Sequence, residues 1–529
     1  MANFGGLGSM GGAPAPRIMA TPYVISQTTQ WMLSGNGWRC PTQHYVPGSG
    51  GLWGVSEKWF ISDDYWTFAP RYLFTNWYLT TSGGGGQEAA NGNSINIEAV
   101  SFQVGINGSP VQLTVNGSSA TYTLADDSEI WTDVPSSVIA IPPRTRCCIR
   151  VAWAVPNSSS NIASPYPGVR QMFGDKAEYS GSATLSAKVM AGGISSSTPA
   201  GNLVYFYTAS AMVAQGWDGR PVVLGFGTSI ESGGGSGQAR LMAGPMGSIG
   251  PIEKGMDSTY GGAPRLPFTN WSVSSGLAAG ISGTGANQGL TRRMRALAAL
   301  PNVPMTANYT GFGTNDATGT LSTWQSNMTA LWSALKTGFP SCRLIQSTLW
   351  PRTSSTDGFT TVANQSAQSA NWTYPTGTAY GLYNWMKGNN PSSGALDGVI
   401  DILDLVDNKS GGGTRGTWRV DLTDTGWSTT LQASISSSFS SFTLGALPRA
   451  GTILSILDGT QEAVYISTVS GTSSPFTANC ALNGVNAHTN GASIVEKAPT
   501  VEGTHPGEVI AQYVADRGYA AHKLAGTFG

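Results

Sequence analysis

Apolar side chains alternate with other residues in the first part of the chain. Two runs carry an apolar residue at every second position: Val100, Phe102, Val104 and Ile106, then Val111, Leu113 and Val115. This period of two predicts strands, and Asn116-Gly117 after the second run predicts a tight hairpin turn. Further strand-like runs stand at 148–153 and 183–189. We therefore expect residues 18–214 to form an all-β, sandwich-like region.

The pattern changes after residue 215, where short apolar runs alternate with helix-compatible stretches. The apolar runs lie at 221–225, 344–349 and 399–402, and the helical stretches at 289–300, 324–335, 379–386 and 508–524. Strands that alternate with helices favour an α/β domain built on a parallel sheet. Its first part is expected at 215–424 and its completion at 499–529.

Strand-like runs in a segment rich in Ser and Thr return at 425–498, between the two parts of the α/β domain. The strand-like runs are 452–457, 462–469 and 492–495. We predict a small β module inserted into the α/β domain, and residues 1–17, rich in Gly, Ala and Pro, as a flexible or docking arm. The segment 483–492, which contains His488, resembles a β module that recurs in bacteriophage tail and fibre proteins, so His488 is assigned to the fold of that module.

The composition limits the possible partners. Only 11% of the 529 residues are charged, and 28 Lys and Arg against 29 Asp and Glu leave a net charge of -1. Such a chain lacks the basic surface that a nucleic acid or an anionic membrane needs. A surface covered by Gly, Ser, Thr and Asn is typical of extracellular β-proteins and of proteins that face sugars.

The cysteines and the N-terminus bear on the compartment. The five cysteines form an odd count with one adjacent pair, which fits neither a disulfide framework nor zinc-ligand spacing. The first residues have no basic segment followed by an apolar run, so we expect no signal peptide, and no apolar run is long enough for a membrane span. A virion protein, assembled in the cytoplasm and released by lysis, would satisfy both expectations.

Acid-base chemistry has few candidates, because the chain has only four histidines. His505 follows Glu502 by three residues, just before the last predicted helix. A short turn can place that carboxylate on the imidazole Nδ1 and leave Nε2 free to act as a base. A plain surface loop is the alternative for this segment.

A candidate nucleophile follows the apolar run at 221–225. Ser229 stands where the strand should end, which is the edge at which open α/β sheets bind ligands. A turn serine beside flexible glycines is the alternative. Two further segments, 270–276 with Gly276 and 311–316 with Asn315, offer a backbone N–H and a side-chain amide of the kind that stabilises an oxyanion.

In this order the four segments resemble the SGNH, or GDSL-type, serine hydrolase family: a Gly-x-Ser block, a Gly block, a Gly-x-Asn-Asp block and an acid-x-x-His block. The resemblance spans residues 218–408 and 498–526 and implies a three-layer α/β hydrolase domain. It implies Ser229 as nucleophile and first oxyanion donor, Gly276 and Asn315 as further donors, His505 as base and Glu502 as its orienting acid. Thr228 and Glu502 depart from the family, which usually has Asp at both places.

The resemblance implies a serine esterase that needs no cofactor, and the virion setting makes an O-acetyl group on a host-surface polysaccharide the expected substrate. Expected partners are that glycan, other virion proteins and further copies of the chain, and the expected location is the virion surface or otherwise the extracellular space. Two alternatives remain: an inactive structural or receptor-binding virion protein on a hydrolase fold, and a secreted bacterial carbohydrate esterase.

Two other features leave function open. Aromatic residues crowd residues 18–90, where they could stack on sugars or form a core and a trimer interface. Asp63-Asp64 and Asp126-Asp127 lack the frame of a calcium loop, so no metal is expected.

Overall fold

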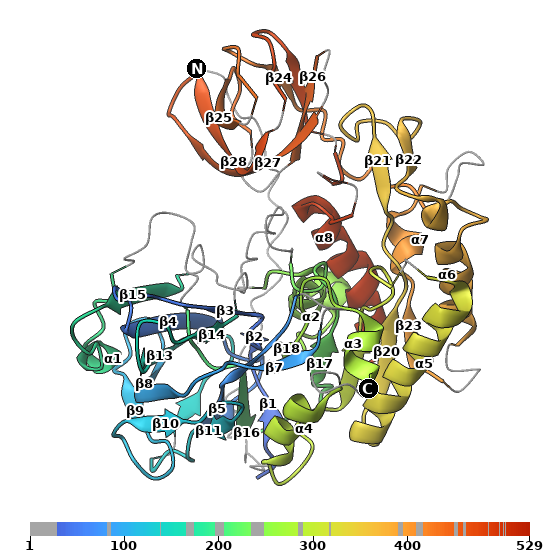
Figure 1. Cartoon of the computed structure of the whole chain (residues 1–529). Helices are drawn as coiled ribbons and strands as arrows, with labels where there is room; N and C mark the ends of the chain where they lie inside the picture. The colour runs from blue at the N-terminus through green and yellow to red at the C-terminus, as the bar shows by residue number, and fades with distance from the viewer. Residues whose placement is uncertain are drawn as a thin grey trace, which may run out of the picture.

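The N-terminal part of the protein is a pair of antiparallel sheets (Figure 1). The computed structural model describes residues 29–81, 86–137, 139–165, 174–195, 206–233, 248–283, 289–316, 319–389, 395–408, 416–437, 439–448, 453–458, 462–484, 486–496, 498–500, 502 and 504–529. The predicted arm at 1–17 lies outside this range.

One sheet consists of β1 (Met32–Leu33), β16 (Ala211–Gln215), β5 (Thr67–Thr75) and β11 (Glu129–Trp131) in that order, with β12 (Ala140–Ile141) also on β5. The other has the order β10 (Tyr122–Leu124), β8 (Ile95–Val104), β13 (Arg146–Ala154), β4 (Trp53–Ile61) and β15 (Lys176–Ser180), with β9 (Val111–Leu113) on β8. Side chains from both sheets share one core, which includes Phe60, Tyr72, Phe74, Phe102 and Trp153. The predicted β-sheets of this region are therefore present, and most of its described aromatics are buried.

The predicted turn at Asn116-Gly117 is present. Val115 and Ser118 exchange two backbone hydrogen bonds of 2.8 and 3.2 Å. Asn116 and Gly117 have φ values of 53° and 76°, and two successive positive φ angles belong to the tight hairpin turn that Asn-Gly favours.

The strand predicted at 183–189 is wrong. Its last residues belong instead to α1 (Ala187–Ala191), where Val189 alone is buried, together with Val55 and Ala152 of the second sheet. The Ser180 hydroxyl accepts the backbone N–H groups of Ser182 and Ala183, which starts a turn where a strand would have to continue.

The second domain contains a parallel sheet of six strands, with helices packed against it (Figure 1). The order is β2 (Asn36–Arg39), β18 (Phe268–Asn270), β17 (Val223–Phe226), β19 (Ala307–Thr310), β20 (Arg343–Ser347) and β23 (Gly398–Ile400). Successive residues of β17 belong to different hydrophobic cores. Leu224 shares its core with residues of α3 (Ala278–Ser282), α4 (Thr291–Ala298), α5 (Leu321–Gly338) and α6 (Thr378–Gly388). Val223 shares its core with residues of α2 (Pro251–Asp257), α7 (Ile402–Val406) and α8 (Glu508–Val514). The sheet thus lies between two helical layers.

The remaining elements are short. They are the paired strands β3 (Gln43–Tyr45) with β14 (Ile162–Ser164), β6 (Trp77–Leu79) with β7 (Glu88–Ala90) and β21 (Thr353–Ser355) with β22 (Gln365–Ala367), the 3-10 turns at Tyr260–Gly262 and Ala370–Trp372, and the π-helical turn Ala515–Tyr519 that joins α8 to α9 (Ala520–Leu524).

The first strand of the parallel sheet comes from the region predicted as separate. β2 lies inside the expected 18–214 segment, yet it pairs in parallel with β18. Trp38 of β2 packs into the sandwich core, whereas Arg39 reaches Ser232 after β17. Its sequence, Asn-Gly-Trp-Arg, shows neither the alternation of a half-buried strand nor the apolar run typical of a buried parallel strand, so nothing in it reveals its sheet.

The C-terminal β module has the strand order β24 (Ser428–Thr430), β29 (Ser493–Val495), β26 (Ile453–Leu457), β27 (Glu462–Ser470), β28 (Phe476–Gly484) and β25 (Phe439–Leu444). Its first strand pairs with its last, so Ser428 lies opposite Val495 and the two ends meet. Ile453 and Ala498 pack against Phe359, which fixes the module to the α/β domain.

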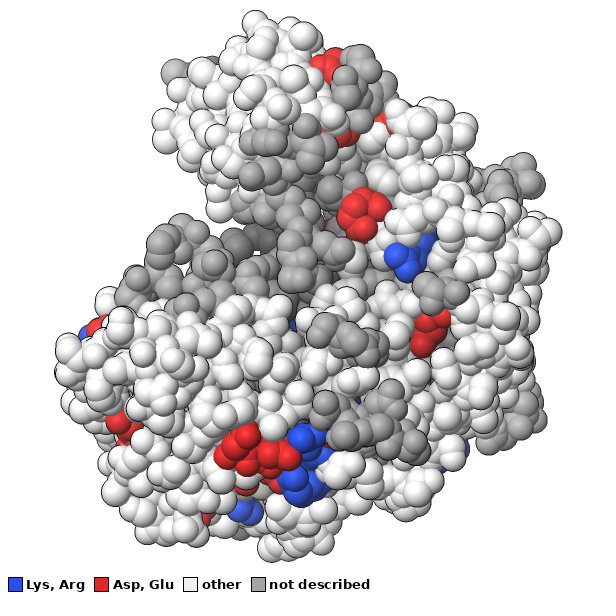
Figure 2. All heavy atoms as spheres, viewed as in Figure 1, with Lys and Arg blue, Asp and Glu red and all other residues white. Residues whose placement is uncertain are grey.

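The surface carries few charges. On the face drawn in Figure 2, most spheres are white, and the red and blue ones form small scattered groups, one of which joins both colours near the bottom of the view. Within the described part of the chain, no helix has both the length and the apolar character needed to cross a membrane.

A buried lysine supports the C-terminal helices. The Lys523 amine donates to the carbonyl oxygens of Met256 at 3.0 Å and Ser258 at 2.6 Å. Burial lowers the pKa of Lys523 to about 7, although Asp257 opposes the shift. A neutral amine has the two hydrogens that these carbonyls require.

We expect Lys523→Met to change the pH dependence of stability. The unfolded chain binds a proton on Lys523 up to its ordinary pKa of 10.5, whereas the folded chain releases it near 7. The free energy of unfolding of the native protein should therefore rise, relative to the variant, by on the order of 1 kcal/mol or more from about pH 7 to about pH 9.

Denaturant titrations at both pH values measure this difference. Lys336→Met removes a lysine whose side chain is 41% exposed and serves as the control. A difference between native protein and Lys523→Met that does not change with pH would contradict the buried neutral amine.

Candidate active site

The candidate nucleophile stands on a tight turn at the end of β17. Ser229 follows β17 by three residues and is 6% exposed. The Ser232 N–H donates to Thr228 O at 3.0 Å, and the Gly233 N–H to Ile230 O at 3.0 Å. These bonds turn the chain away from the sheet directly after Ser229. Among the described residues, none accepts the Ser229 N–H.

His505 reaches this serine from the far end of the chain. Its Nε2 lies 2.6 Å from Ser229 Oγ, and its Nδ1 lies 2.7 Å from Glu502 Oε1. The His505 backbone N–H also donates to Glu502 Oε1 at 2.6 Å, and the Thr500 hydroxyl donates to His505 O at 2.7 Å. The loop therefore fixes the position and the orientation of the imidazole.

The Glu502 carboxylate is suited to orient an imidazole. Burial opposes its ionised form, but hydrogen bonds from the His505 ring and backbone hold the pKa of Glu502 below its ordinary value. Glu502 is therefore charged at neutral pH, and it requires a hydrogen on Nδ1, which leaves Nε2 as the proton acceptor facing Ser229. The extra methylene of Glu compared with Asp does not prevent the contact.

The two other predicted donors lie at the ends of the neighbouring strands. A Cβ placed on Gly276 would stand 2.9 Å from Gly227 O, so this glycine lies against the nucleophile loop. The Asn315 Nδ2 donates to Gly276 O at 3.3 Å, and its second hydrogen meets no described acceptor. β18, β17 and β19 are adjacent in the sheet, which explains why the loops after them meet.

Gly276 differs from its predicted role in one respect. Its N–H donates to Val273 O at 3.1 Å, within a turn where Ser275 has a φ of 60°. The N–H can contribute to an oxyanion hole only by sharing its hydrogen or by releasing Val273 O.

Two buried carboxyl groups that the sequence analysis did not single out support these loops. Glu231 Oε2 accepts the Thr228 N–H at 2.9 Å and the Thr228 hydroxyl at 2.8 Å. A Cβ on Gly227 would stand 2.7 Å from Glu231 Cγ, and one on Gly311 would stand 2.4 Å from its Cδ. Both glycines thus make room for a carboxyl directly beneath the nucleophile turn, and burial raises the pKa of Glu231.

Asp316 joins the other two loops. Its Oδ1 accepts the Ala278 N–H at 3.0 Å, at the start of α3, and its Oδ2 accepts the Gly313 N–H at 3.1 Å. Burial raises the pKa of Asp316 to about 6, against the effect of these hydrogen bonds. Asp316 therefore connects the Gly276 segment with the Asn315 segment.

A buried ion pair holds the nucleophile loop from its other side. Arg39 donates to Ser232 O and to Glu253 Oε1, both at 2.5 Å, and the Asn270 amide donates to Glu253 Oε1 and Glu231 O, both at 2.9 Å. A sequence signal existed for Glu231, which is the one charged residue within 221–239. None existed for Arg39, because 193 residues separate it from Ser232.

The other histidines lie outside this site. His44 stacks on Tyr78 with the ring centroids 4.5 Å apart, and His522 Nδ1 contacts the Thr527 hydroxyl. His488 lies between Asp458 and Glu462 inside the β module, at 3.0 and 2.8 Å.

The aspartate pairs contact basic or polar groups. Asp64 pairs with Arg144, Asp127 pairs with Arg292, and Asp63 accepts the Ser34 hydroxyl. Among the described residues, no three His, Cys, Asp or Glu side chains stand where they could hold a metal together.

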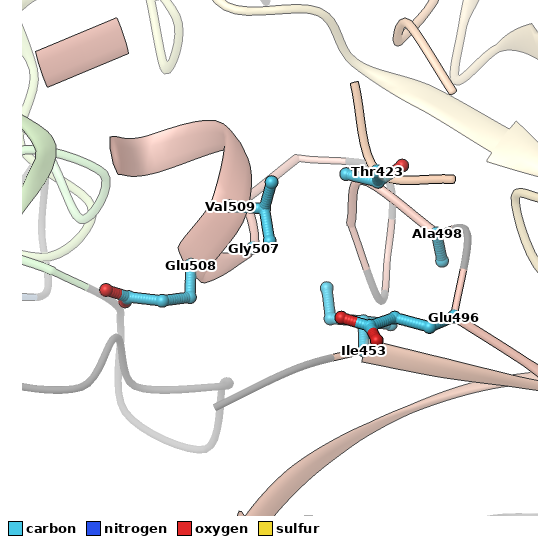
Figure 3. Close-up of a pocket in the computed structure, with 7 residues that line it drawn as sticks. All are labelled: Thr423, Ile453, Glu496, Ala498, Gly507, Glu508 and Val509. Carbon is cyan, nitrogen blue, oxygen red and sulfur yellow. The ribbon is translucent and has the colours of Figure 1, made fainter. Parts of the chain in front are cut away.

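Two cavities elsewhere do not belong to this site. The one in Figure 3 lies between Ile453 and Glu496 of the β module and Gly507 at the start of α8, and its volume of about 10 Å³ suits a single water. A larger one of about 570 Å³ lies where β20 and β23 begin, lined by Arg343 and Gly398. This cavity lies at the amino ends of β20 and β23, whereas Ser229 follows the carboxyl end of β17, at the opposite edge of the sheet.

Comparison with known proteins gives distant structural likenesses. No protein-family model and no curated protein matches the chain. The chain is similar to a putative lipolytic protein of the G-D-S-L family from Desulfitobacterium hafniense, at 14% identity and a TM-score of 0.23, over 39% of this chain and 87% of the other.

Two carbohydrate esterases are also similar to this chain. One, an acetylesterase from Sinorhizobium meliloti, matches at 16% identity and a TM-score of 0.23, over 37% of this chain and 89% of its own. The other, a family two enzyme from Cellvibrio japonicus, matches at 9% identity and the same TM-score, over 71% of this chain and 89% of its own. At these TM-scores none of the likenesses assigns a function, which has to come from the site itself.

Glu231→Gln should make Ser229 less reactive. Glutamine keeps the shape and one oxygen that can accept from Thr228, but an amide oxygen carries less negative charge than a carboxylate oxygen, so both hydrogen bonds to Thr228 become weaker. Labelling of Ser229 by a fluorophosphonate should slow about 10-fold, the scale of losing one hydrogen bond to a charged group.

The rate of covalent labelling, followed by mass spectrometry, measures this effect. Glu178→Gln makes the same change in the sandwich, where Glu178 pairs with Lys188, and should label at the native rate. Equal rates for Glu231→Gln and the native protein would contradict a supporting role for Glu231.

Proposed function

We propose that this protein is a serine esterase of SGNH type that removes acyl groups, most simply acetyl, from the hydroxyls of a polysaccharide. One observation carries the proposal: His505 lies between Ser229 Oγ and Glu502 Oε1, at 2.6 and 2.7 Å. A serine hydroxyl needs a base within hydrogen-bond reach to act as a nucleophile, and this base is oriented by a carboxylate.

In the first half of the reaction, Ser229 Oγ attacks the carbonyl carbon of the ester, and its proton passes to His505 Nε2. The imidazolium that forms is stabilised by the Glu502 carboxylate. Collapse of the tetrahedral intermediate breaks the bond to the sugar oxygen, which takes the proton from Nε2 and leaves as an alcohol.

In the second half, water attacks the acyl-enzyme carbonyl while His505 takes a proton from that water. The second tetrahedral intermediate then expels Ser229 Oγ, which regains its proton from Nε2, and the carboxylic acid departs. The Ser229 N–H and the free hydrogen of Asn315 Nδ2 would hold the oxyanion in both intermediates, with Gly276 as a third donor if its turn bond is shared.

Features of the sequence support a setting for the proposed reaction. A surface with 11% charged residues suits contact with a glycan, and the module that contains His488 resembles those of bacteriophage fibres. We place the enzyme on a virus particle, as a homo-oligomer that contacts other virion proteins and acts on a host-surface polysaccharide. Repetition of the chain would turn weak glycan contacts into avid binding.

One observation favours a second function. The Gly276 N–H is already bound to Val273 O, so one of three expected oxyanion donors is engaged. An inactive receptor-binding virion protein could retain the fold and the contacts among Ser229, His505 and Glu502 with an incomplete oxyanion hole. Turnover of 4-nitrophenyl acetate distinguishes the two functions, because only the esterase releases nitrophenol at a rate that depends on Ser229.

Substitutions in the site should lower the turnover to different degrees. Ser229→Ala and His505→Ala should each lower kcat by about 10⁴-fold or more, because nucleophile and base act as a unit. Asn315→Ala should cost on the order of 10²-fold, the scale of one oxyanion donor. Glu502→Gln should cost at least about 10²-fold, because an amide cannot stabilise the imidazolium.

Steady-state kinetics on the ester measures these changes, with His44→Ala as the histidine control because its ring stacks on Tyr78 in the sandwich. Full activity of the Ser229→Ala variant would contradict the proposed mechanism. If Glu502→Gln has the kcat of the native protein while His505→Ala is inactive, the enzyme works with a Ser-His dyad instead of a triad.

The proposed location has a separate test. Mass spectrometry of purified particles should find the chain together with other virion proteins. Its recovery only from the medium of uninfected bacteria would favour the alternative of a secreted carbohydrate esterase.

A further inference from the structure

An arginine stands beside the candidate active site without a carboxylate partner. Arg352 lies five residues after β20, the strand next to β19 in the sheet. Its Nη1 donates to Thr314 O at 3.3 Å, and the next residue along the chain is Asn315, the proposed oxyanion donor. Arg352 therefore borders the place where an ester must bind.

The guanidinium of Arg352 is held in position by uncharged groups. Its Nε donates to Gln368 Oε1 at 3.0 Å, and its Cζ lies 5.6 Å from the centroid of the Trp372 ring. These contacts use one edge and one face of the guanidinium. They reduce the entropy that the side chain would lose on binding a ligand.

Arg352 differs from most described arginines in its lack of an ion pair. Nine others have a carboxylate oxygen within 4 Å: Arg39, Arg144, Arg150, Arg220, Arg265, Arg292, Arg293, Arg295 and Arg419. No described carboxylate approaches Arg352 that closely. Glu502 is near enough to act on its charge, but the Glu502 carboxylate is bound to His505.

The donors that remain define the ligand. Nη1 gives one hydrogen to Thr314 O, and Nη2 donates to no described acceptor. Nη1 and Nη2 therefore keep three N–H hydrogens without a described acceptor, and these can donate to the two oxygens of a carboxylate. A neutral hydroxyl or acetyl group would use one of these donors and leave the positive charge without a partner.

We infer that Arg352 binds the carboxylate of an acidic sugar in the substrate, next to the sugar that carries the acyl group. The inference rests on the proposed esterase function and narrows its substrate class to acylated acidic polysaccharides, such as those built from uronic acids. Arg352 then acts as a specificity residue and takes no part in the acyl transfer.

The test compares acetylated oligogalacturonides with acetylated xylo-oligosaccharides of equal length, which lack carboxylates. Native protein should prefer the acidic substrate, and Arg352→Gln should lower kcat/KM on it by about 10- to 100-fold, mainly through KM. Activity of the same variant on the neutral substrate and on 4-nitrophenyl acetate should stay within about threefold of native.

Two variants serve as controls. Arg352→Lys keeps the charge but not the paired donors and should retain part of the preference. Arg144→Gln removes an arginine that pairs with Asp64, away from the site, and should behave as native.

Three outcomes would overturn the inference. An equal loss on acidic and neutral substrates would mean that Arg352 only supports the Thr314 loop. If the native protein shows no preference for the acidic substrate, Arg352 does not bind a carboxylate of the substrate. If the native protein prefers acetylated sugar phosphates over acetylated uronides, the ligand of Arg352 is a phosphate and not a carboxylate.

A binding experiment separates this inference from the esterase proposal. Calorimetry with Ser229→Ala, and with the double variant that also carries Arg352→Gln, measures affinity for oligogalacturonide without turnover. If the native protein hydrolyses no ester but Ser229→Ala still binds the acidic oligomer through Arg352, the proposed function fails and the inference stands. Equal affinity in both variants overturns the inference.

Discussion

The candidate site depends on one buried ion pair, between Arg39 and Glu253. The side chains are 4% and 0% exposed, and burial of two charges is tolerated only when hydrogen bonds satisfy their remaining atoms. Arg39 also donates to Ser232 O, and Glu253 also accepts the Asn270 amide and the Ile249 N–H. Since Arg39 stands on β2, which lies between the sandwich strands β1 and β4 in the sequence, the nucleophile loop is complete only when this strand has joined the parallel sheet. The β-rich region is therefore a structural part of the site as well as a neighbour of it.

The parallel sheet brings the rest of the site together. Strands that run in the same direction end at one edge, so the loops after β18, β17, β19 and β20 meet there although they are far apart in sequence. Buried carboxyl groups then fix the loops to one another: Glu231 holds the nucleophile turn, and Asp316 joins the helix after β18 to the loop after β19. Removing such a carboxyl would leave buried N–H groups without acceptors, which is costly.

The same requirement explains the state of Gly276. A buried N–H needs an acceptor while no substrate is bound, and Val273 O provides one at 3.1 Å. An oxyanion carries more charge than a peptide carbonyl and competes well for that hydrogen. Arg352 is in the opposite situation, because its position at the rim lets water satisfy its charge until an anion arrives.

The sequence by itself indicated many of the local elements and the residues of the candidate site. Periodicity located β8 and β13, helix-compatible runs located α5 and α6, Asn-Gly set the turn at 116–117, and the four blocks named Ser229, Asn315, Glu502 and His505. It misplaced 183–189 and gave no sign that β2 belongs to the second domain, because Asn-Gly-Trp-Arg has neither an alternating pattern nor an apolar run. Only the tertiary structure decided which polar groups meet: Arg39 with Ser232, the Glu231 carboxyl with Thr228, and the Gly276 N–H with Val273 O. It also left Arg352 without a carboxylate partner among the described residues. Spacing along the chain constrains local backbone geometry, whereas these contacts depend on the order of strands in the sheet and on the need of each buried polar group for a partner.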